Sequence, residues 1–294
     1  MPTNGRVGSR VSLRYRLHDG STEAFTDVVG HLEALTPVVV VRTKSDGHVE
    51  IDPADVVSVR ELSHAPVRNS EIRAVEHAAA LAWPGTEQHW LDGWLLRAGG
   101  GATMRANSAA PLDFSADLTA LPGIAAWYAE RGLPPWLALP ERLLPVRAAG
   151  VRPSRVLTRE LSGGPDVVLP SGPDDRWLQI YGGDVPVEVL TAVVDGDVAF
   201  ATVADAAVGR VALTSAPDGT RWAGLSAVAV LEARRGCGHS RAVSDTLLAW
   251  AANHGAGQAY VQVIDDNVPA IALYESMGFR LHHRYRYVAA TDLL

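Results

Sequence analysis

The chain has 294 residues, 47% of them hydrophobic and 20% charged, a balance typical of a globular protein with a sizeable core. The formal net charge of −7 argues against a general binder of nucleic acids or anionic membranes. The single cysteine cannot form a disulfide within the chain, no Cys/His cluster has the spacing of a metal site, and no apolar stretch has membrane-spanning length. We therefore expect a cytoplasmic protein that binds neither a metal ion nor a membrane.

Residues 1–63 are predicted to form a small β-barrel. In the first expected strand, 7–18, Val11, Leu13 and Tyr15 alternate with polar residues, which indicates one buried face. Further strands are expected at 25–35, 38–43, 48–51 and 56–62, with turns at 19–21 and 45–47. A packing or dimerisation module is favoured over a ligand-binding one. Residues 63–67 are the expected linker.

The next segment, 67–165, mixes helices and strands. A helix is expected over 69–84, with Asn69 and Ser70 as N-terminal caps. Two strands, 90–97 and 102–108, are expected to flank a triple-glycine run, with Trp90 and Trp94 sharing a buried face of the first. The later expected elements are a helix over 121–132, a strand over 135–139, a short helix over 140–150 and a strand over 156–161. Residues of the second strand that are candidates to reach a cleft are Arg105, Asn107 and Ser108.

A polar Pro/Gly stretch, 165–175, is the expected connection to a last segment, 175–294. Its expected elements are a helix at 186–192, strands at 198–203, 209–214 and 225–231, a helix at 241–253, a strand at 259–263, a helix that ends near 278 and a strand at 282–287. In that last strand, alternation places His283, Tyr285 and Tyr287 on the face opposite His282.

The most informative run is 235–240, Arg-Gly-Cys-Gly-His-Ser, which joins the strand 225–231 to the helix 241–253. A glycine-rich turn that opens a helix directs backbone N–H groups and the positive end of the helix dipole at one point, which suits a phosphate group. Arg235 beside the turn favours a pyrophosphate. A Gly-x-Gly run alone is also an ordinary turn or helix cap.

A second run follows at 270–279, Ala-Ile-Ala-Leu-Tyr-Glu-Ser-Met-Gly-Phe. In this order, the two runs resemble the Q/R-x-x-G-x-G/A and A-x-x-L-Y-x-x-x-G-F motifs of the GNAT superfamily of N-acetyltransferases, except that Ser240 stands in the last small position. The core resemblance covers 187–288. It implies an α/β (α+β) fold with a mixed central sheet, in which 175–294 is the acetyl-CoA-binding half.

The resemblance extends to the rest of the chain in weaker form. Segment 67–165 lacks the glycine loop and looks like a degenerate GNAT-like half, as in tandem GNAT proteins. Residues 1–63 resemble the SH3-like barrels attached to some actinobacterial GNAT proteins.

Acetyl-CoA is the cosubstrate that the resemblance implies, and an amine attacks its thioester directly. Tyr274 would then protonate the leaving thiolate, unless it is only a packing tyrosine. The residues implied to bind acetyl-CoA are Val228, Ala229 and Val230 on the strand, Arg235, Gly236, Cys237, Gly238, His239 and Ser240 in the turn, and Asn267. The structural alternatives are core packing for the valines, a surface charge for Arg235 and a helix cap for Asn267. A nucleophilic Cys237 is disfavoured.

The sequence thus predicts an acetyl-CoA-dependent N-acetyltransferase whose acceptor, a small-molecule amine or a protein lysine, stays open. A non-catalytic acetyl-CoA sensor or interaction protein is the alternative. No spacing argument selects a general base from the nearby carboxylates, Glu232, Asp265, Asp266 and Glu275, so a water chain remains an option.

Overall fold

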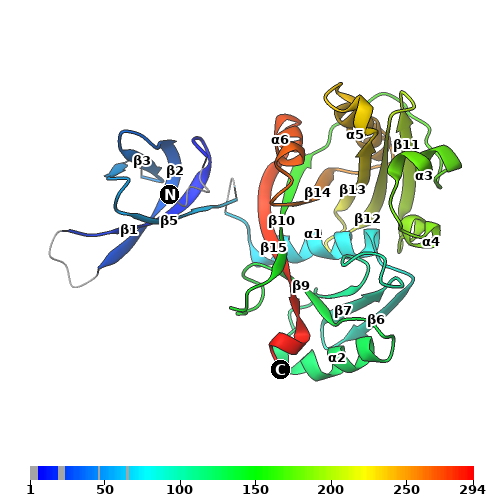
Figure 1. Cartoon of the computed structure of the whole chain (residues 1–294), viewed down its shortest axis with the longest axis horizontal. Helices are drawn as coiled ribbons and strands as arrows, with labels where there is room; N and C mark the ends of the chain where they lie inside the picture. The colour runs from blue at the N-terminus through cyan, green and yellow to red at the C-terminus, as the bar shows by residue number, and fades with distance from the viewer. Residues whose placement is uncertain (1–5, 19–23, 46, 64–65) are drawn as a thin grey trace. The chain divides into compact units, whose positions relative to one another are not determined.

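The computed structural model describes residues 6–18, 24–45, 47–63 and 66–294 (Figure 1). The chain divides into two compact units, Met1–Val67 and Arg68–Leu294. The predicted turn at 19–21 lies outside the described residues, as do Asp46 of the turn at 45–47 and His64 and Ala65 of the linker.

The N-terminal unit is an antiparallel sheet of five strands in the order β4-β3-β2-β1-β5. The strands are β1 (Arg10–Arg16), β2 (Phe25–Ala34), β3 (Val39–Thr43), β4 (His48–Ile51) and β5 (Val56–Glu61). The predicted alternation is confirmed, because Val11 and Leu13 are fully buried whereas Arg14 is exposed. They pack against Leu32 and Val41 in one core, so this unit is a small β domain.

The second unit is built on a sheet of ten strands in the order β11-β12-β13-β14-β10-β15-β9-β8-β7-β6. The strands are β6 (Glu87–Leu91), β7 (Trp94–Ala98), β8 (Ser108–Pro111), β9 (Trp136–Pro140), β10 (Val151–Glu160), β11 (Asp197–Val203), β12 (Ala207–Ser215), β13 (Arg221–Val230), β14 (Gln258–Ile264) and β15 (Arg280–Ala289). The β13–β14 and β8–β9 pairs are parallel and the other registered pairs antiparallel. The predicted mixed central sheet is therefore confirmed.

Helices cover both faces of this sheet (Figure 1). They are α1 (Asn69–Ala82), α2 (Leu121–Ala129), α3 (Asp175–Tyr181), α4 (Val187–Thr191), α5 (His239–Asn253) and α6 (Val268–Ser276). Successive strand residues face opposite sides, and on β13 Trp222 packs with α1 whereas Ala223 packs with α5 and α6. The strands β13 and β14 thus lie between α1 on one side and α5 and α6 on the other.

The first turn of α1 differs from the prediction, because Asn69 and Ser70 lie inside the helix. The Glu71 carboxylate instead accepts a hydrogen bond of 2.5 Å from the Arg68 backbone N–H. An acidic side chain in the first turn satisfies a free N–H and complements the helix dipole.

The prediction that Trp90 and Trp94 share one face is wrong. Asp92 and Gly93 adopt φ of 44° and 82° and form a two-residue hairpin turn between β6 and β7. Asp-Gly favours such a turn because both positions need positive φ. Trp90 is consequently 50% exposed on β6, whereas Trp94 is fully buried on β7.

Two other predicted elements are loops. Residues 102–107 form no strand, because the Asn107 side-chain oxygen accepts from the N–H groups of Gly99 and Gly101 and folds the chain back. The predicted helix at 140–150 is also wrong. There the Arg286 guanidinium donates to the carbonyls of Val146 and Ala148 and fixes a non-helical path.

The segments 67–165 and 175–294 share the ten-stranded sheet. β10 lies between β14 and β15, and β15 lies between β10 and β9. The last strand thereby joins the strands of the first segment to those of the second.

Candidate functional site

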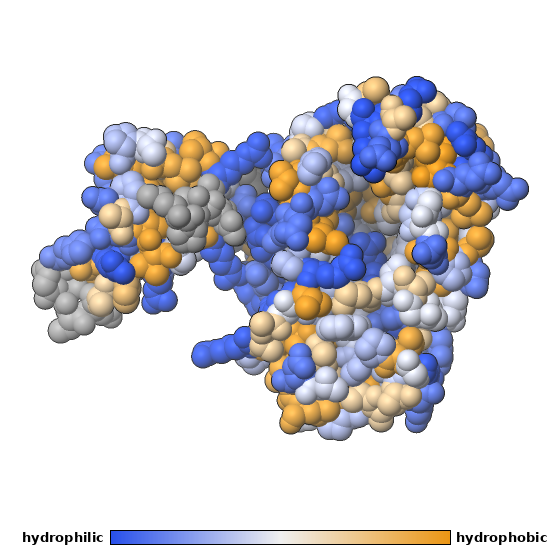
Figure 2. Space-filling view, viewed as in Figure 1, coloured by the Kyte–Doolittle hydropathy of each residue, from blue (hydrophilic) through white to orange (hydrophobic). Residues whose placement is uncertain are grey.

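The strands β13 and β14 separate halfway along β13. Their registered pairs run from Trp222–Gln258 to Leu225–Val261 and end there. The residues 222–225 are buried, whereas 226–230 are only half-buried. The space-filling view shows the second unit hollowed between the α6 side and the β12–β13 side (Figure 2).

A β-bulge at this point bends β13. Between the pairs Arg210–Ser226 and Val208–Ala229, β13 carries one more residue than β12. Ala227 inside the bulge adopts a left-handed φ of 51°, a conformation that a residue with a Cβ rarely takes. The bulge turns the strand away from β14 and leaves backbone groups of β13 at the opening.

The predicted glycine turn connects β13, through a 3-10 turn at Glu232–Arg234, to α5. Gly236 and Gly238 have φ of 75° and 81°, and a Cβ built on either meets nothing within 4 Å. Glycine is therefore required by backbone conformation and not by crowding. The Ala242 N–H bonds the Gly238 carbonyl, so the N–H groups of residues 239–241 precede the helical ladder. The turn thus offers N–H donors at the positive end of α5.

Side chains add positive charge at this turn. Arg235 is exposed, and one nitrogen of Arg234 lies 3.4 Å from Nε2 of His239. The exposed Cys237 thiol lies 3.7 Å from the Arg235 carbonyl oxygen. These groups surround a place that suits an anion.

Tyr274 lies on α6 and is 6% exposed, with its ring 5.4 Å from the Phe279 ring. Burial raises the pKa of the Tyr274 phenol, and the nearby Ser244 hydroxyl offsets this only in part. The phenol therefore keeps its proton at neutral pH and is available as a donor.

The remaining predicted residues divide by role. The Asn267 side chain accepts from the Ala270 N–H at 3.2 Å, so its structural alternative as a helix cap is confirmed. Val228 and Val230 pack against the α5–α6 core, and Ala229 packs on the opposite side. The side chains of these three residues are used for packing, so only their backbone N–H and C=O groups remain to bind a ligand.

A buried polar cluster on the α1 side of the sheet was missed by sequence reasoning. Glu76 is 5% exposed, and its Oε1 accepts from Nε2 of His283 at 2.9 Å and from Nε2 of Gln262 at 3.4 Å. Because Gln262 donates to a carboxylate, its own carbonyl oxygen is the atom left for another partner. The only signal in the sequence was a glutamate on the apolar face of a helix.

The carboxylates considered from the sequence are less suited to act as a base. Asp265 accepts from Arg155 and Arg284 at 3.0 Å, so it is committed to ion pairs. Glu232 and Asp266 are exposed.

Next to the cluster, a cavity of about 10 Å³, the space of one water molecule, lies at the strand opening. Its polar lining residues are Arg105, Arg210, Ser226, Tyr260 and Gln262. The sequence placed Arg105, Asn107 and Ser108 near a cleft, and of these Arg105 alone lines this cavity.

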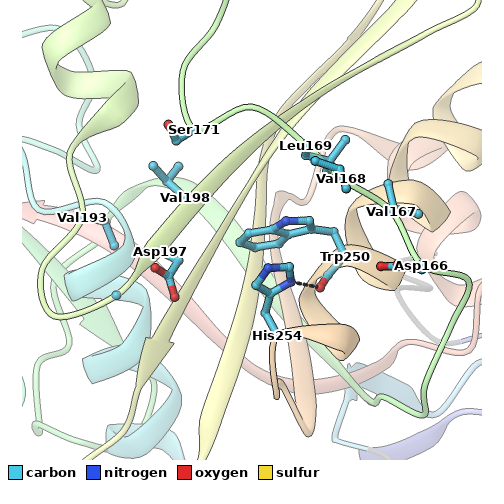
Figure 3. A pocket seen from close by; sticks show the side chains of 11 residues that line it. Asp166, Val167, Val168, Leu169, Ser171, Val193, Asp197, Val198, Trp250 and His254 are labelled. Carbon is cyan, nitrogen blue, oxygen red and sulfur yellow. Dashed lines mark hydrogen bonds between the residues drawn. The ribbon is translucent and has the colours of Figure 1, made fainter.

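A larger groove of about 560 Å³ lies elsewhere (Figure 3). It is bordered by Trp250 and His254, whose rings stack at 4.2 Å, and by the extended residues Val168 and Leu169. Trp250 is the twelfth residue of α5, which places it about 18 Å from the glycine turn. The groove also shares no lining residue with the cavity at the strand opening, so the two are separate.

Comparison with known proteins decides the family. Residues 69–288 match the family model described as "Probable histone acetyltransferase Rv0428c C-terminal", and residues 5–60 match "Rv0428c N-terminal Sm-like domain". The chain is 51% identical over 293 residues to the probable histone acetyltransferase Rv0428c of Mycobacterium tuberculosis, which covers 98% of this chain and 96% of the relative. The chain belongs to this acetyltransferase family.

Two further similarities agree with this placement. An uncharacterized N-acetyltransferase of Bacillus subtilis, YobR, is 39% identical over 67 residues, 22% of this chain and 27% of that protein. A GCN5-related N-acetyltransferase from Kribbella flavida shares the fold with a TM-score of 0.52 at 17% identity, over 76% of this chain and 96% of that structure.

The chain is thus an acetyltransferase, and the predicted GNAT fold is confirmed by the GCN5-related N-acetyltransferase that shares it. Proteins of the GNAT superfamily use acetyl-CoA as the donor. Within the part of the chain that the structure describes, no helix is both long and apolar enough to cross a membrane.

Proposed function

We propose that this chain transfers the acetyl group of acetyl-CoA to an amine at the opening between β13 and β14. The observation that carries this proposal is the end of strand pairing at Leu225–Val261, on two strands of which one leads into the glycine turn and the other into the helix that carries Tyr274. A thioester in the opening has backbone groups of β13 on one side and a protonated phenol as a proton source.

In this proposal the glycine turn holds the pyrophosphate of acetyl-CoA. The N–H groups of Gly236, Cys237, Gly238, His239 and Ser240 point at the phosphate oxygens, and the dipole of α5 adds to the attraction. Arg235 supplies a charge-assisted bond from the exposed rim of the turn.

The pantetheine arm then runs along β13. The bulge leaves backbone groups of Val228, Ala229 and Val230 for the arm amides, in the manner of an added strand. Asn267 contributes its side-chain N–H₂, because its oxygen is already used by the Ala270 N–H.

The reaction proceeds by direct attack. The amine nitrogen bonds to the thioester carbon, and a backbone N–H near Val228 stabilises the oxyanion of the tetrahedral intermediate. The carbon–sulfur bond breaks, and the Tyr274 hydroxyl gives its proton to the CoA thiolate. The amine loses one proton to water, and solvent returns a proton to Tyr274.

The organisation proposed for the chain is a barrel at 1–63, a degenerate GNAT-like half at 67–165 and the acetyl-CoA-binding half at 175–294, in a cytoplasmic protein. The barrel is proposed to be SH3-like and to serve packing or homodimerisation. The acceptor is either a small amine or a protein lysine, and the name of the mycobacterial relative makes a lysine a candidate.

The test compares two glycines in similar surroundings. Gly236 and Gly219 both have positive φ and open space for a Cβ, but Gly219 lies in the remote β12–β13 turn. Replacing either by Ala adds a strain of about 1–2 kcal/mol, so both variants should lose similar stability.

Gly236→Ala alone should weaken acetyl-CoA binding, read as a smaller rise of the melting temperature at a fixed acetyl-CoA concentration. The wild type should also release CoA when an amine acceptor is added. No melting shift at millimolar acetyl-CoA, or an equal loss of the shift in both variants, would contradict the proposed site.

A further inference from the structure

Three guanidinium groups gather around Trp83, beside the strand opening. Arg97 donates to the Trp83 carbonyl at 3.4 Å, and the guanidinium carbons of Arg105 and Arg210 lie 5.7 and 4.5 Å from the Trp83 ring centre. Among the described residues, no carboxylate lies within ion-pair distance of any of the three. Glu76, the buried carboxylate of this region, is already paired with His283.

Two of the three guanidiniums are compensated by carbonyl groups. Arg210, which is 1% exposed, donates to Leu190, Ala192 and Ala82, at the ends of α4 and α1. Carbonyls at the end of a helix carry partial negative charge. Arg97 likewise donates to the carbonyl and the hydroxyl of Ser108. These two arginines therefore serve the structure.

Arg105 differs from both. Its Nε is fully buried and has no hydrogen-bond partner among the described residues. Its polar neighbours are the phenols of Tyr285, Tyr287 and Tyr260. Burial raises the pKa of Tyr260 and of Tyr287, so neither provides a negative charge. Arg105 as a whole is half-buried, but an N–H that is shielded from water and has no acceptor is unfavourable.

The position of Arg105 connects this charge to the reaction. Arg105 lines the small cavity together with Ser226 and Gln262, each the next residue after the last β13–β14 pair. The cavity therefore begins where the thioester is proposed to lie. It has the space of one water molecule, or of one oxygen atom of a larger group, and Arg105 is a lining residue with which no carboxylate of the described chain pairs.

We propose that the acceptor is a small amine that carries a carboxylate, and that Arg105 binds this carboxylate at the cavity, with one carboxylate oxygen in its water-sized space. The proposal rests on the acetyl transfer proposed above and names its acceptor class. A carboxylate on Arg105 holds the amine of the same molecule toward the opening, where the Gln262 carbonyl oxygen is free to accept its N–H. A lysine side chain of a protein has only methylenes near its amine and leaves the guanidinium unpaired.

The experiment measures acetylation of matched acceptors. Amino acids with α-, β- and γ-amino groups are each compared with the amide of the same amino acid, which lacks the negative charge, and with a lysine-containing histone peptide. Wild type is expected to prefer at least one acid over its amide by about 10- to 100-fold in kcat/KM, the factor expected for a charged hydrogen bond.

Arg105→Gln should abolish that preference through a higher KM for the acid, and Arg105→Lys should restore part of it. Neither should change the KM for acetyl-CoA. Arg221→Gln removes an arginine from the far end of β13 and should keep the preference. If Arg105→Gln does not fold, the comparison of each acid with its amide in the wild type still tests the proposed acceptor class.

Equal turnover of acids and amides overturns the acceptor class, and so does turnover of the peptide alone. Acetyl-CoA binding without turnover of any acid overturns it as well. The proposed function itself fails by a different result, the absence of both acetyl-CoA binding and CoA release.

Discussion

His282 should make the second unit less stable in mild acid. Its Nδ1 lies 2.7 Å from Nδ1 of His283 on β15. Burial, followed by the charges of His283 and Arg142, lowers the pKa of His282 from 6.5 to about 3. The folded chain thus keeps His282 neutral at a pH where the unfolded chain protonates it.

The sign and size follow from proton linkage. Between pH 6.5 and 3 the unfolded state binds a proton that the folded state does not, so the stability that is present above pH 6.5 is lost as the pH falls. For these two pKa values the loss at pH 5, relative to pH 8, is about 2 kcal/mol.

The assay is urea unfolding at pH 8 and pH 5, followed by tryptophan fluorescence. All eight tryptophans belong to the second unit, so the signal reports on it alone. His282→Gln keeps a hydrogen-bonding side chain that does not titrate, and wild type should lose about 2 kcal/mol more than this variant. His89→Gln, which removes an exposed histidine, should behave as wild type. Equal losses in wild type and His282→Gln would refute the reasoning.

Three further predictions concern the site. Tyr274→Phe should lower kcat by about 100-fold in a CoA-release assay, with the KM for acetyl-CoA unchanged, because it removes only the proton donor; unchanged turnover would contradict this role. Gly224→Ala should destabilise the chain by about 1–3 kcal/mol in urea unfolding, because the new Cβ collides with the buried Tyr260 hydroxyl, and an unchanged midpoint would show that the ring moves freely. Glu76→Ala should cost about 3 kcal/mol by the same measurement, since it leaves His283 without its buried partner, whereas a loss below about 0.5 kcal/mol would mean that the pair is replaceable.

Local signals in the sequence predicted much of the fold. The alternation at Val11–Leu13 identified a strand, and the spacing of Gly236 and Gly238 before a helical period predicted the turn that the structure contains. Such features depend on a few neighbouring residues, so they can be read from one sequence. The Asp92–Gly93 turn was an equally local signal. The single strand predicted across it was wrong because the run of apolar residues was given more weight than the Asp-Gly pair, which favours a turn.

The polar cluster beneath the strand opening was beyond such reasoning. Glu76 and His283 are 207 residues apart, and Arg105 meets Tyr285 only after the sheet has formed. Neither contact leaves a spacing pattern in the sequence. Which residues meet in these contacts is set by the register of β10 and β15, and local propensity does not determine that register.

The position of β15 in the sheet also affects how the second unit folds during synthesis and how it can be engineered. This strand is made last, yet it fills the gap between β10 and β9. During synthesis the strands β6 to β9 therefore keep an unpaired edge until residues 280–289 have emerged from the ribosome, and contacts this distant in sequence form slowly. A fragment limited to either segment would expose strand edges that pair with other chains, so the two segments cannot be exchanged between proteins as independent modules.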